Sequence, residues 1–232
     1  MVIAAIGTPL VLWNYLKTTK NQQEENRPPI VNRLEKNFAF ANQDKKIVSI
    51  SDLDGKVWCY TAFTITNFDA YANTFEEMRL LEEKFSGRED FQLVAITLDP
   101  EHDVPSKLNA LMEEKGFDSD RWLFLTAGPE KLRKYMKKQL KVDMIYQKQV
   151  DGEKEWVFPS FVGLIDKNRH LRQRYDFDQA HEERAGRQAD LEKVPALTGN
   201  EEFMKRLNAP QGLRKVMYAN IEHLFQEDLT TR

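Results

Sequence analysis

The sequence predicts an α/β protein built on a mixed sheet that helices flank on both faces. A chain of 232 residues with 41% hydrophobic side chains can bury one substantial core. Apolar runs rich in β-branched and aromatic residues alternate with segments of helical periodicity, and turn-forming residues separate them. This alternation is typical of α/β folds.

The folded part is expected to begin near Phe38 with a hairpin. Residues 38–50 form two short apolar runs joined by a polar turn, and SDLDGK at 51–56 forms a second turn. The run VWCYTAFTI that follows is apolar at successive positions. It is therefore expected to be a central strand with both faces buried.

The first long helix is expected over residues 74–85. Thr74-Phe75-Glu76-Glu77 has the S/T-x-x-E form of a capping box, and an apolar stripe follows at Phe75, Met78, Leu81 and Phe85. Beyond it the patterns predict strands at 91–98, 121–127 and 160–166, helices at 105–116 and 129–140, and a hairpin at 144–158.

The last third of the chain changes character. Residues 178–212 are polar and are interrupted by Pro195, Gly199, Pro210 and Gly212, so a long excursion with one short helix at 201–207 is expected there. An amphipathic helix should follow and close the domain, because six apolar residues share one helical face: Leu213, Val216, Met217, Ile221, Leu224 and Phe225. We assign 179–232 to this C-terminal extension.

The N-terminus predicts a membrane anchor over residues 1–17 and a tether over 18–37. Positions 2–16 are apolar, and Lys17 and Lys20 follow them. Fifteen helical residues cover roughly 22 Å, less than the bilayer core of about 30 Å. A signal-like segment or a helix buried on a partner is therefore an alternative, and the Pro28-Pro29 pair favours an extended tether.

Charge and cysteine content exclude several classes of function. The 34 basic and 37 acidic side chains give a net charge of −3, so no nucleic-acid partner is expected. Cys59 is the single cysteine and lies mid-strand, where a buried, inert thiol is expected. The four histidines stand in scattered polar segments, and no Cys/His spacing predicts a zinc site.

Five segments together resemble the Sco/SenC family of thioredoxin-fold, membrane-tethered copper proteins associated with cytochrome c oxidase assembly. They cover about 38–178 and are SDLDGKVW, FTITN, AITLDPEHDVPSKL, RWLFLTA and FVGLIDKNRHLRQRYDF. The family's D-P-x-x-D-T-P motif corresponds to Asp99, Pro100, Asp103 and Pro105, with Val104 replacing the threonine. The resemblance implies a thioredoxin-like fold and a membrane-anchored domain on the periplasmic or intermembrane-space side.

The resemblance also implies a copper site that this sequence does not reproduce. The family places a C-x-x-x-C pair at the first strand-to-helix junction and a histidine before the strand FVGLID. In this sequence the first cysteine position is Phe68 and the second is Ala72, and the histidine position falls on or beside Phe158. A register shift of one residue gives Asn67 with Tyr71, or Asp69 with Asn73. None of these supplies a thiolate, the donor that suits Cu(I) or thiol chemistry.

Three further expectations concern the surroundings of this junction. Phe68 and Phe158 either meet where the metal would sit or pack locally, each with its own neighbours. Pro159 stands near the place where thioredoxin folds keep a cis-proline and is a candidate for a cis bond. Asp99, His102 and Asp103 have two interpretations. They could form a site for a divalent ion. We favour a structural role in the turn after the strand, with Asp103 accepting backbone N–H bonds as the cap of the helix that starts near Pro105.

The helix at 129–140 has a strongly basic face. Its apolar side faces inward, so the charges are expected to form a solvated surface, with docking of an acidic partner as the alternative. The basic residues are Lys131, Arg133, Lys134, Lys137, Lys138 and Lys141.

The sequence therefore predicts a non-enzymatic, membrane-tethered Sco/SenC-like protein without a cofactor. It would bind a protein partner, a respiratory oxidase or an assembly component, through its C-terminal extension. Two alternatives stay open: a metal carrier with a site rebuilt from Cys59 or the histidines, and a thiol oxidoreductase that uses Cys59.

Overall fold

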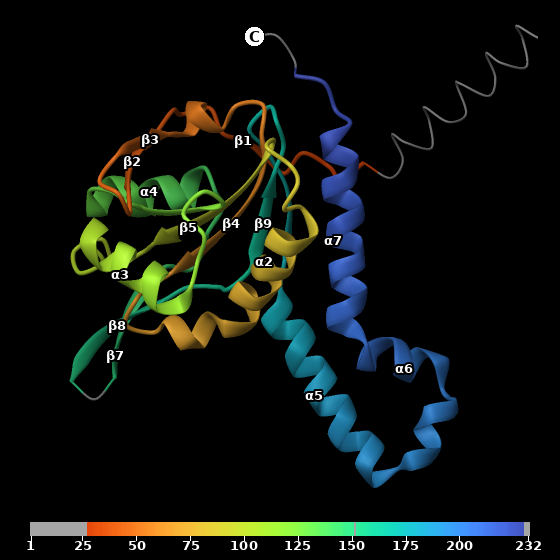
Figure 1. Cartoon of the computed structure of the whole chain (residues 1–232). Coiled ribbons are helices and arrows are strands. Elements are labelled where there is room, and N and C mark those ends of the chain that lie inside the picture. Colours follow the sequence, from red (N-terminus) through yellow and green to blue (C-terminus); the bar gives the residue numbers. More distant parts are fainter. Residues whose placement is uncertain (1–26, 151, 230–232) are drawn as a thin grey trace, which may run out of the picture.

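The computed structural model describes residues 27–150 and 152–229 and has the predicted α/β architecture. An eight-stranded mixed sheet lies between helices, and helices α5, α6 and α7 extend from one side of the domain (Figure 1). The predicted anchor at 1–17 lies outside the described residues. Within the described ranges, no helix combines the length and apolar character needed to cross a membrane.

The large sheet has the strand order β1-β10-β9-β4-β5-β6-β2-β3, and β7 and β8 form a separate hairpin. The strands are β1 (Asn32–Arg33), β2 (Ala39–Asn42), β3 (Ile47–Ser49), β4 (Val57–Phe63), β5 (Phe91–Thr97), β6 (Trp122–Thr126), β7 (Tyr146–Val150), β8 (Glu153–Val157), β9 (Val162–Ile165) and β10 (His170–Tyr175). The predicted N-terminal hairpin is confirmed as β2 and β3.

The helices of the described chain divide into those of the domain and those of the C-terminal extension. Those of the domain are α2 (Ala72–Lys84), α3 (Pro105–Lys115) and α4 (Pro129–Lys138), and those of the extension are α5 (Phe177–Lys193), α6 (Glu201–Leu207) and α7 (Ala209–Phe225). Short 3₁₀ helices cover Ile50–Leu53, Phe68–Tyr71 and Pro195–Gly199.

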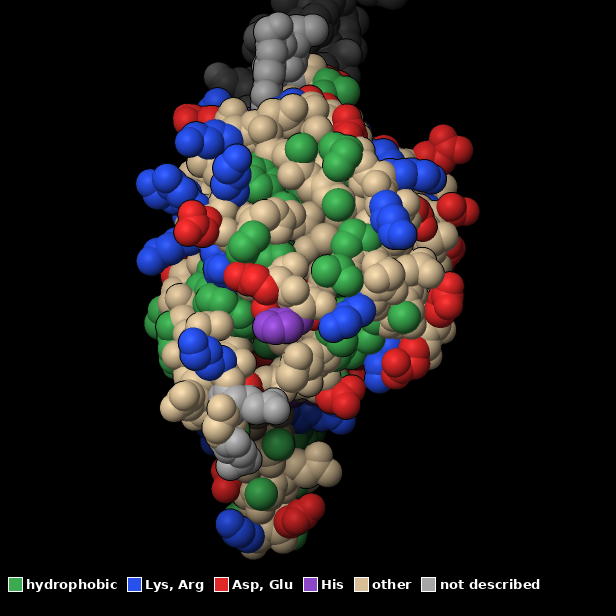
Figure 2. Space-filling model, turned by 90° about the vertical axis from the view of Figure 1, so that its left-hand side faces the viewer, with side chains coloured by type: hydrophobic (Ala, Val, Ile, Leu, Met, Phe, Trp, Pro, Cys, Tyr) green, Lys and Arg blue, Asp and Glu red, His purple; other side chains and the backbone are tan. Residues whose placement is uncertain are grey.

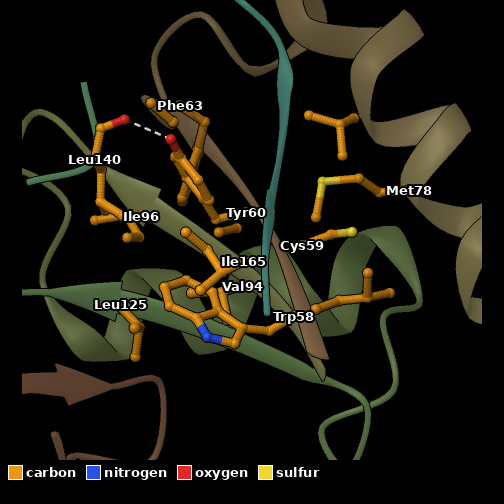
Figure 3. Packing of buried hydrophobic residues seen from close by; sticks show 14 of the residues in the cluster. Trp58, Cys59, Tyr60, Phe63, Met78, Val94, Ile96, Leu125, Leu140 and Ile165 are labelled. Atoms are coloured by element: carbon orange, nitrogen blue, oxygen red, sulfur yellow. Dashed lines mark hydrogen bonds between the residues drawn. The ribbon is translucent and has the colours of Figure 1, made fainter. Parts of the chain in front are cut away.

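Strand β4 is the centre of the sheet, as its sequence predicts. It runs parallel to β5 and antiparallel to β9, and all of its residues are buried. Cys59 points toward Met78 of α2, whereas Tyr60 points to the opposite face and donates a hydrogen bond to the carbonyl of Leu140 at 2.5 Å (Figure 3). Alternate residues of β4 therefore contact different helical layers.

Strand β9 approaches β4 closely at Gly163. Gly163 is the direct partner of Tyr60 in the antiparallel register, and the Tyr60 ring lies over the glycine. A Cβ atom at residue 163 would stand 2.1 Å from Tyr60 Cε1. Tyr60 is fully buried, so only a residue without a side chain fits opposite it.

The described part of the predicted tether belongs to the folded domain. Strand β1 pairs with β10, and Leu34 is buried. Arg172, which is itself buried, donates hydrogen bonds to the Pro28 carbonyl and to Glu227 beyond α7. The folded domain therefore begins before residue 38, where the sequence placed its start. Strand pairing of β1 and the side-chain hydrogen bonds at Arg27 and Pro28 already attach this segment to the domain.

Helix α2 does not begin with the predicted capping box. The 3₁₀ turn Phe68–Tyr71 leads into the helix at Ala72, and Tyr71 takes the N-cap position without a side-chain hydrogen bond. Thr74 lies inside the first turn, and its hydroxyl shares a 2.7 Å hydrogen bond with that of Ser160. A tertiary contact has replaced the local cap that the sequence suggests.

The polar excursion is largely helical, which corrects the sequence-based expectation. Helix α5 occupies 17 residues, and only Phe177 and Ala180 of it are buried. A helix with so small a buried face shows no apolar stripe in its sequence. The short helix at 201–207 is confirmed as α6, and the terminal amphipathic helix as α7, which buries Met217, Ile221 and Leu224.

An ion pair between Glu77 and Arg214 joins α7 to α2. Glu77 is fully buried, and both of its carboxylate oxygens accept from the Arg214 guanidinium at 2.6 Å. His181 of α5 places Nε2 at 3.7 Å from the same carboxylate. The C-terminal extension therefore covers the outer face of α2.

Replacement of Gly163 by alanine should destabilise the fold. The new Cβ would overlap the immobile Tyr60 ring, so we expect a loss of about 2–3 kcal/mol in urea unfolding. Gly186→Ala is the matched control, because no atom lies within 4 Å of its added Cβ in α5, and it should stabilise by about 0.5–1 kcal/mol. Equal effects of the two substitutions would contradict the close approach of β4 and β9.

Removal of Arg214 should destabilise much more than removal of an exposed partner between the same two helices. Arg214→Ala removes both arginine hydrogen bonds from the buried Glu77 carboxylate, at an expected cost of about 2–4 kcal/mol after allowance for the partly exposed arginine. Lys84→Ala breaks an exposed pair with Glu222 and should cost less than about 1 kcal/mol. Urea unfolding of both variants measures the difference, and similar losses would show that the Glu77–Arg214 pair does not hold α7.

Candidate functional site

The candidate site is the junction between β4 and α2, where the resemblance places copper ligands. The loop after β4 and the 3₁₀ turn Phe68–Tyr71 form one side of it. The segment 158–160, which connects the β7–β8 hairpin to β9, forms the other. Pairing of β4 with β9 brings these two segments together.

Phe68 packs away from the other side of the junction. Its ring centroid lies 4.4 Å from that of Phe75 and 6.1 Å from that of Phe63. Ala72, the second ligand position, is exposed at the start of α2. Two of the three family ligand positions therefore point in different directions.

Phe158 stacks on Tyr71 instead of meeting Phe68. The two ring centroids are 5.1 Å apart at an interplanar angle of 17°, and both side chains are buried. Of the two alternatives for these rings, the structure shows local packing and not convergence of Phe68 with Phe158, and the shifted register that includes Tyr71 identifies the side chain facing Phe158. Burial raises the pKa of Tyr71 to about 12, so its phenol is neutral at pH 7.

Two hydrogen bonds reinforce this contact. Thr74 and Ser160 join α2 to the segment before β9 at 2.7 Å. Asn73 Nδ2 donates to Asp178 Oδ1 of α5 at 3.0 Å, which brings the C-terminal extension to the same junction. Aromatic packing and the Thr74–Ser160 hydrogen bond therefore connect the two segments where the family places a metal, and the bond to the Asp178 carboxylate joins α5 to α2.

The peptide bond before Pro159 is trans. No cis peptide bond occurs in the described residues, so the possible cis bond at Pro159 is not present and the default trans form is. Trans is the lower-energy form of an X-Pro bond, and the neighbouring Phe158 and Ser160 make their contacts with it in place.

Asp103 organises the loop after β4. Its Oδ2 atom accepts hydrogen bonds from the Ile65 amide at 3.1 Å and from the Thr97 hydroxyl at 2.5 Å. Burial raises the pKa of this carboxyl, against the opposing effect of those hydrogen bonds. Helix α3 starts at Pro105 as predicted, but Val104 takes its N-cap position, so Asp103 does not cap it.

Asp99, which is buried, and the exposed His102 form a pair on the same motif. His102 Nδ1 lies 2.9 Å from Asp99 Oδ2, and 72% of the imidazole side chain is exposed. The metal-carrier hypothesis requires a histidine close to Cys59 or to the carboxylates of Asp99 and Asp103, and His102 is close to Asp99. The Asp103 carboxylate instead accepts hydrogen bonds from the Ile65 amide and the Thr97 hydroxyl. Within 27–150 and 152–229, no three His, Cys, Asp or Glu side chains group closely enough to hold a metal ion.

Cys59 lies in the core, as its position in the strand predicts. Its side chain is fully buried beside Met78 on the α2 face of the sheet (Figure 3). Burial raises the pKa of the thiol far above its ordinary value. Thiolate is the reactive species, so the native fold opposes nucleophilic chemistry at this position.

Sequence reasoning missed Ser160 and Asp178 and gave Tyr71 only as an alternative. The sequence signal for Tyr71 was its place four residues after Asn67, in the shifted register. Ser160 and Asp178 carried no signal of their own, because their partners Thr74 and Asn73 lie 86 and 105 residues away.

The pair of Asp99 and His102 predicts a pH dependence. The hydrogen bond and negative charge of Asp99 raise the pKa of His102 above its ordinary 6.5. The pair's contribution to stability is therefore complete below pH 6.5 and is lost as pH rises through the raised pKa. NMR titration should show this raised value, and Asp99→Asn should return it toward 6.5. Asp118→Asn, at a remote turn, should leave it unchanged, and a His102 pKa at or below 6.5 in the unmodified chain would contradict the pairing.

Comparison with known proteins identifies the family of this chain. The sequence profile of the SCO1/SenC family matches residues 27–193. The SCO1 protein homolog of Bacillus subtilis (strain 168) is 28% identical over 131 residues, which are 55% of this chain and 66% of that protein, slightly less than two thirds of its length.

Solved structures show the same fold. A SCO1/SenC family lipoprotein from Bacillus anthracis str. Ames matches with a TM-score of 0.55 and 25% identity, over 65% of this chain and 88% of that one. BsSco, described as a member of the Sco family of cytochrome c oxidase assembly proteins, matches with a TM-score of 0.51 and 24% identity, over 63% and 85%. The chain has the thioredoxin-like fold of these proteins and belongs to the SCO1/SenC family.

Proposed function

We propose that this protein is a non-catalytic SCO1/SenC member that acts by binding a protein partner and holds neither copper nor a reactive thiol at the family's site. The stack of Tyr71 on Phe158 carries the proposal, because it fills the junction with two buried rings. An aromatic pair of this kind contributes about 0.5–1.5 kcal/mol beyond its buried area.

The donors at the junction support this assignment. Cu(I) is held by soft ligands such as thiolate and thioether, and imidazole also serves copper. The three family positions offer two phenyl rings and a methyl group, and the shifted register offers an amide and a neutral phenol. The junction therefore has contacts between its two segments but offers no electron-pair donor that suits a soft metal.

The same reasoning argues against an enzymatic role through Cys59. The thiol is fully buried and strongly favours its protonated form. A peroxidase or reductase needs an accessible thiolate with a lowered pKa. We therefore propose that Cys59 is a packing residue, that the protein has no cofactor and that it is not an enzyme.

The relatives suggest where such a protein acts. BsSco is described as belonging to a family of cytochrome c oxidase assembly proteins, and the Bacillus anthracis relative is described as a lipoprotein. By analogy, we propose that this chain takes part in the maturation of a respiratory oxidase. The apolar residues 2–16 would tether it to the membrane, with the folded domain on the periplasmic or intermembrane-space side.

Copper binding tests the proposal directly. The unmodified protein should take up no stoichiometric Cu(I) in competition with a chelator, because no thiolate is available at the junction. Two variants restore the ligand set in the two registers: Phe68→Cys with Ala72→Cys and Phe158→His, and Asn67→Cys with Tyr71→Cys and Phe158→His. The second should gain Cu(I) binding, because residue 71 faces residue 158.

A control and a second readout complete this test. Circular dichroism and urea unfolding must show that each variant keeps the fold before copper is added. The tagged, unmodified protein should then be purified from its own membranes, where subunits of the oxidase or its assembly factors should be enriched. Stoichiometric, tight Cu(I) uptake by the unmodified chain would overturn the loss of copper binding, and absence of oxidase components would overturn the proposed place of action.

A further inference from the structure

A hollow lined by lysines lies beside α4, away from the candidate site. Its cavity volume is about 190 Å³, and its lining residues are Lys36, Phe38, Lys131, Lys134, Tyr135, Lys138 and Gln139. We name this set the lysine pocket. Figure 2 shows the face that carries α3, α4 and the β7–β8 hairpin, with Lys and Arg side chains gathered along its left edge.

The three helical lysines of the pocket occupy one face of α4. Lys131, Lys134 and Lys138 are spaced by three and four residues, which places their side chains next to one another on a helix. Lys36, from the segment before β2, approaches the same hollow. The backbone amide of Glu35 donates to the Gln139 side chain at 3.0 Å and fixes this segment against the end of α4.

The charges of the lysine pocket are not compensated. Among the described residues, none of its four lysines makes an ion pair, and all four are exposed. Arg133 on the same helix differs, because it forms a bidentate pair with Glu101 and its guanidinium lies 4.4 Å from the Trp156 ring centroid. The protein thus pairs one cation of α4 internally and leaves a ring of like charges around the hollow.

The floor of the lysine pocket is aromatic. Phe38 stacks on Tyr135 with centroids 4.7 Å apart, and Phe38 is only partly buried. The Tyr135 side chain is almost fully buried, and its hydroxyl has no hydrogen-bond partner among the described residues. An apolar floor below a cationic rim suits a ligand that carries both apolar surface and negative charge.

We propose that the lysine pocket is a docking site for an acidic segment of a partner protein, with one large apolar side chain seated on Phe38 and carboxylates paired with the lysines. The volume equals that of roughly six liquid water molecules, enough for one such side chain. It is below the range of about 300–1,000 Å³ for small-molecule sites, which disfavours a nucleotide or cofactor.

A membrane surface fits these features less well. Anionic lipid is attracted by a broad basic surface, whereas this protein carries a net charge of −3 and concentrates its unpaired lysines around a single hollow. The inference deepens the proposed function by naming the chemistry of the partner. Its test uses copper-free protein, so its outcome does not depend on whether the junction binds a metal.

Binding of synthetic peptides tests the docking site. The probe is a fluorescein-labelled nonapeptide with a central phenylalanine flanked on each side by four aspartate or glutamate residues, and its partner peptide has alanine at the centre. We expect saturable binding of the phenylalanine peptide in fluorescence anisotropy, weakening with added salt because exposed charge pairs are screened. The alanine peptide should bind several-fold more weakly, because it leaves the aromatic floor uncovered.

Charge reversal on one helix supplies a double variant inside the lysine pocket and a single variant outside it. Lys134→Glu combined with Lys138→Glu replaces attraction by repulsion at the rim and should weaken peptide binding about tenfold or more. Lys137→Glu changes the charge of the same helix outside the lysine pocket and should change the affinity less than about twofold. Both variants alter exposed residues, so their urea unfolding should match that of the unmodified protein.

Three outcomes would overturn the docking site. The first is the absence of saturable peptide binding at low salt. The second is equal weakening by Lys137→Glu and by the Lys134→Glu, Lys138→Glu variant, which would indicate non-specific attraction. The third is binding to vesicles with one third anionic phospholipid, weakened by the double variant, without binding of the phenylalanine peptide, which would assign the lysines to a lipid surface.

Discussion

The close approach of Tyr60 to Gly163 sets the geometry on which the rest of the structure depends. Because residue 163 has no side chain, the buried Tyr60 ring can lie over β9, and its hydroxyl reaches the Leu140 carbonyl after α4. One side chain thereby joins the central strand, its antiparallel neighbour and the end of a helix. The position of β9 in turn brings Phe158 and Ser160 opposite the first turn of α2.

Packing and hydrogen bonding hold the junction together. A buried aromatic stack and a hydroxyl pair connect its two segments. These contacts are neutral, so they avoid the desolvation cost of buried charge and do not depend on redox state. Asp103 accepts a hydrogen bond from the Ile65 amide, so this residue of the family motif has a structural role in the loop after β4.

The sequence predicts the parts of this protein whose structure is determined locally. The apolar run of β4, the start of α3 at Pro105 and the stripe of α7 could all be predicted, because periodicity and capping residues act over a few positions. Thr74 could not be placed, since Ser160 competes for its hydroxyl from 86 residues away. The partner of Phe158 could not be predicted either, because the 3₁₀ turn before α2 changes which side chain points toward residue 158. That side chain is Tyr71, whereas Ala72 is exposed.

The C-terminal extension limits where a partner can approach. Arg214 of α7 pairs with the buried Glu77, so the C-terminal extension covers the outer face of α2, and Asp178 of α5 accepts from Asn73 in its first turn. The lysines of α4 lie on the opposite side of the sheet, where no such cover exists among the described residues. The described surface of α4 is therefore open to a partner, whereas the outer face of α2 is occupied by the chain's own helices.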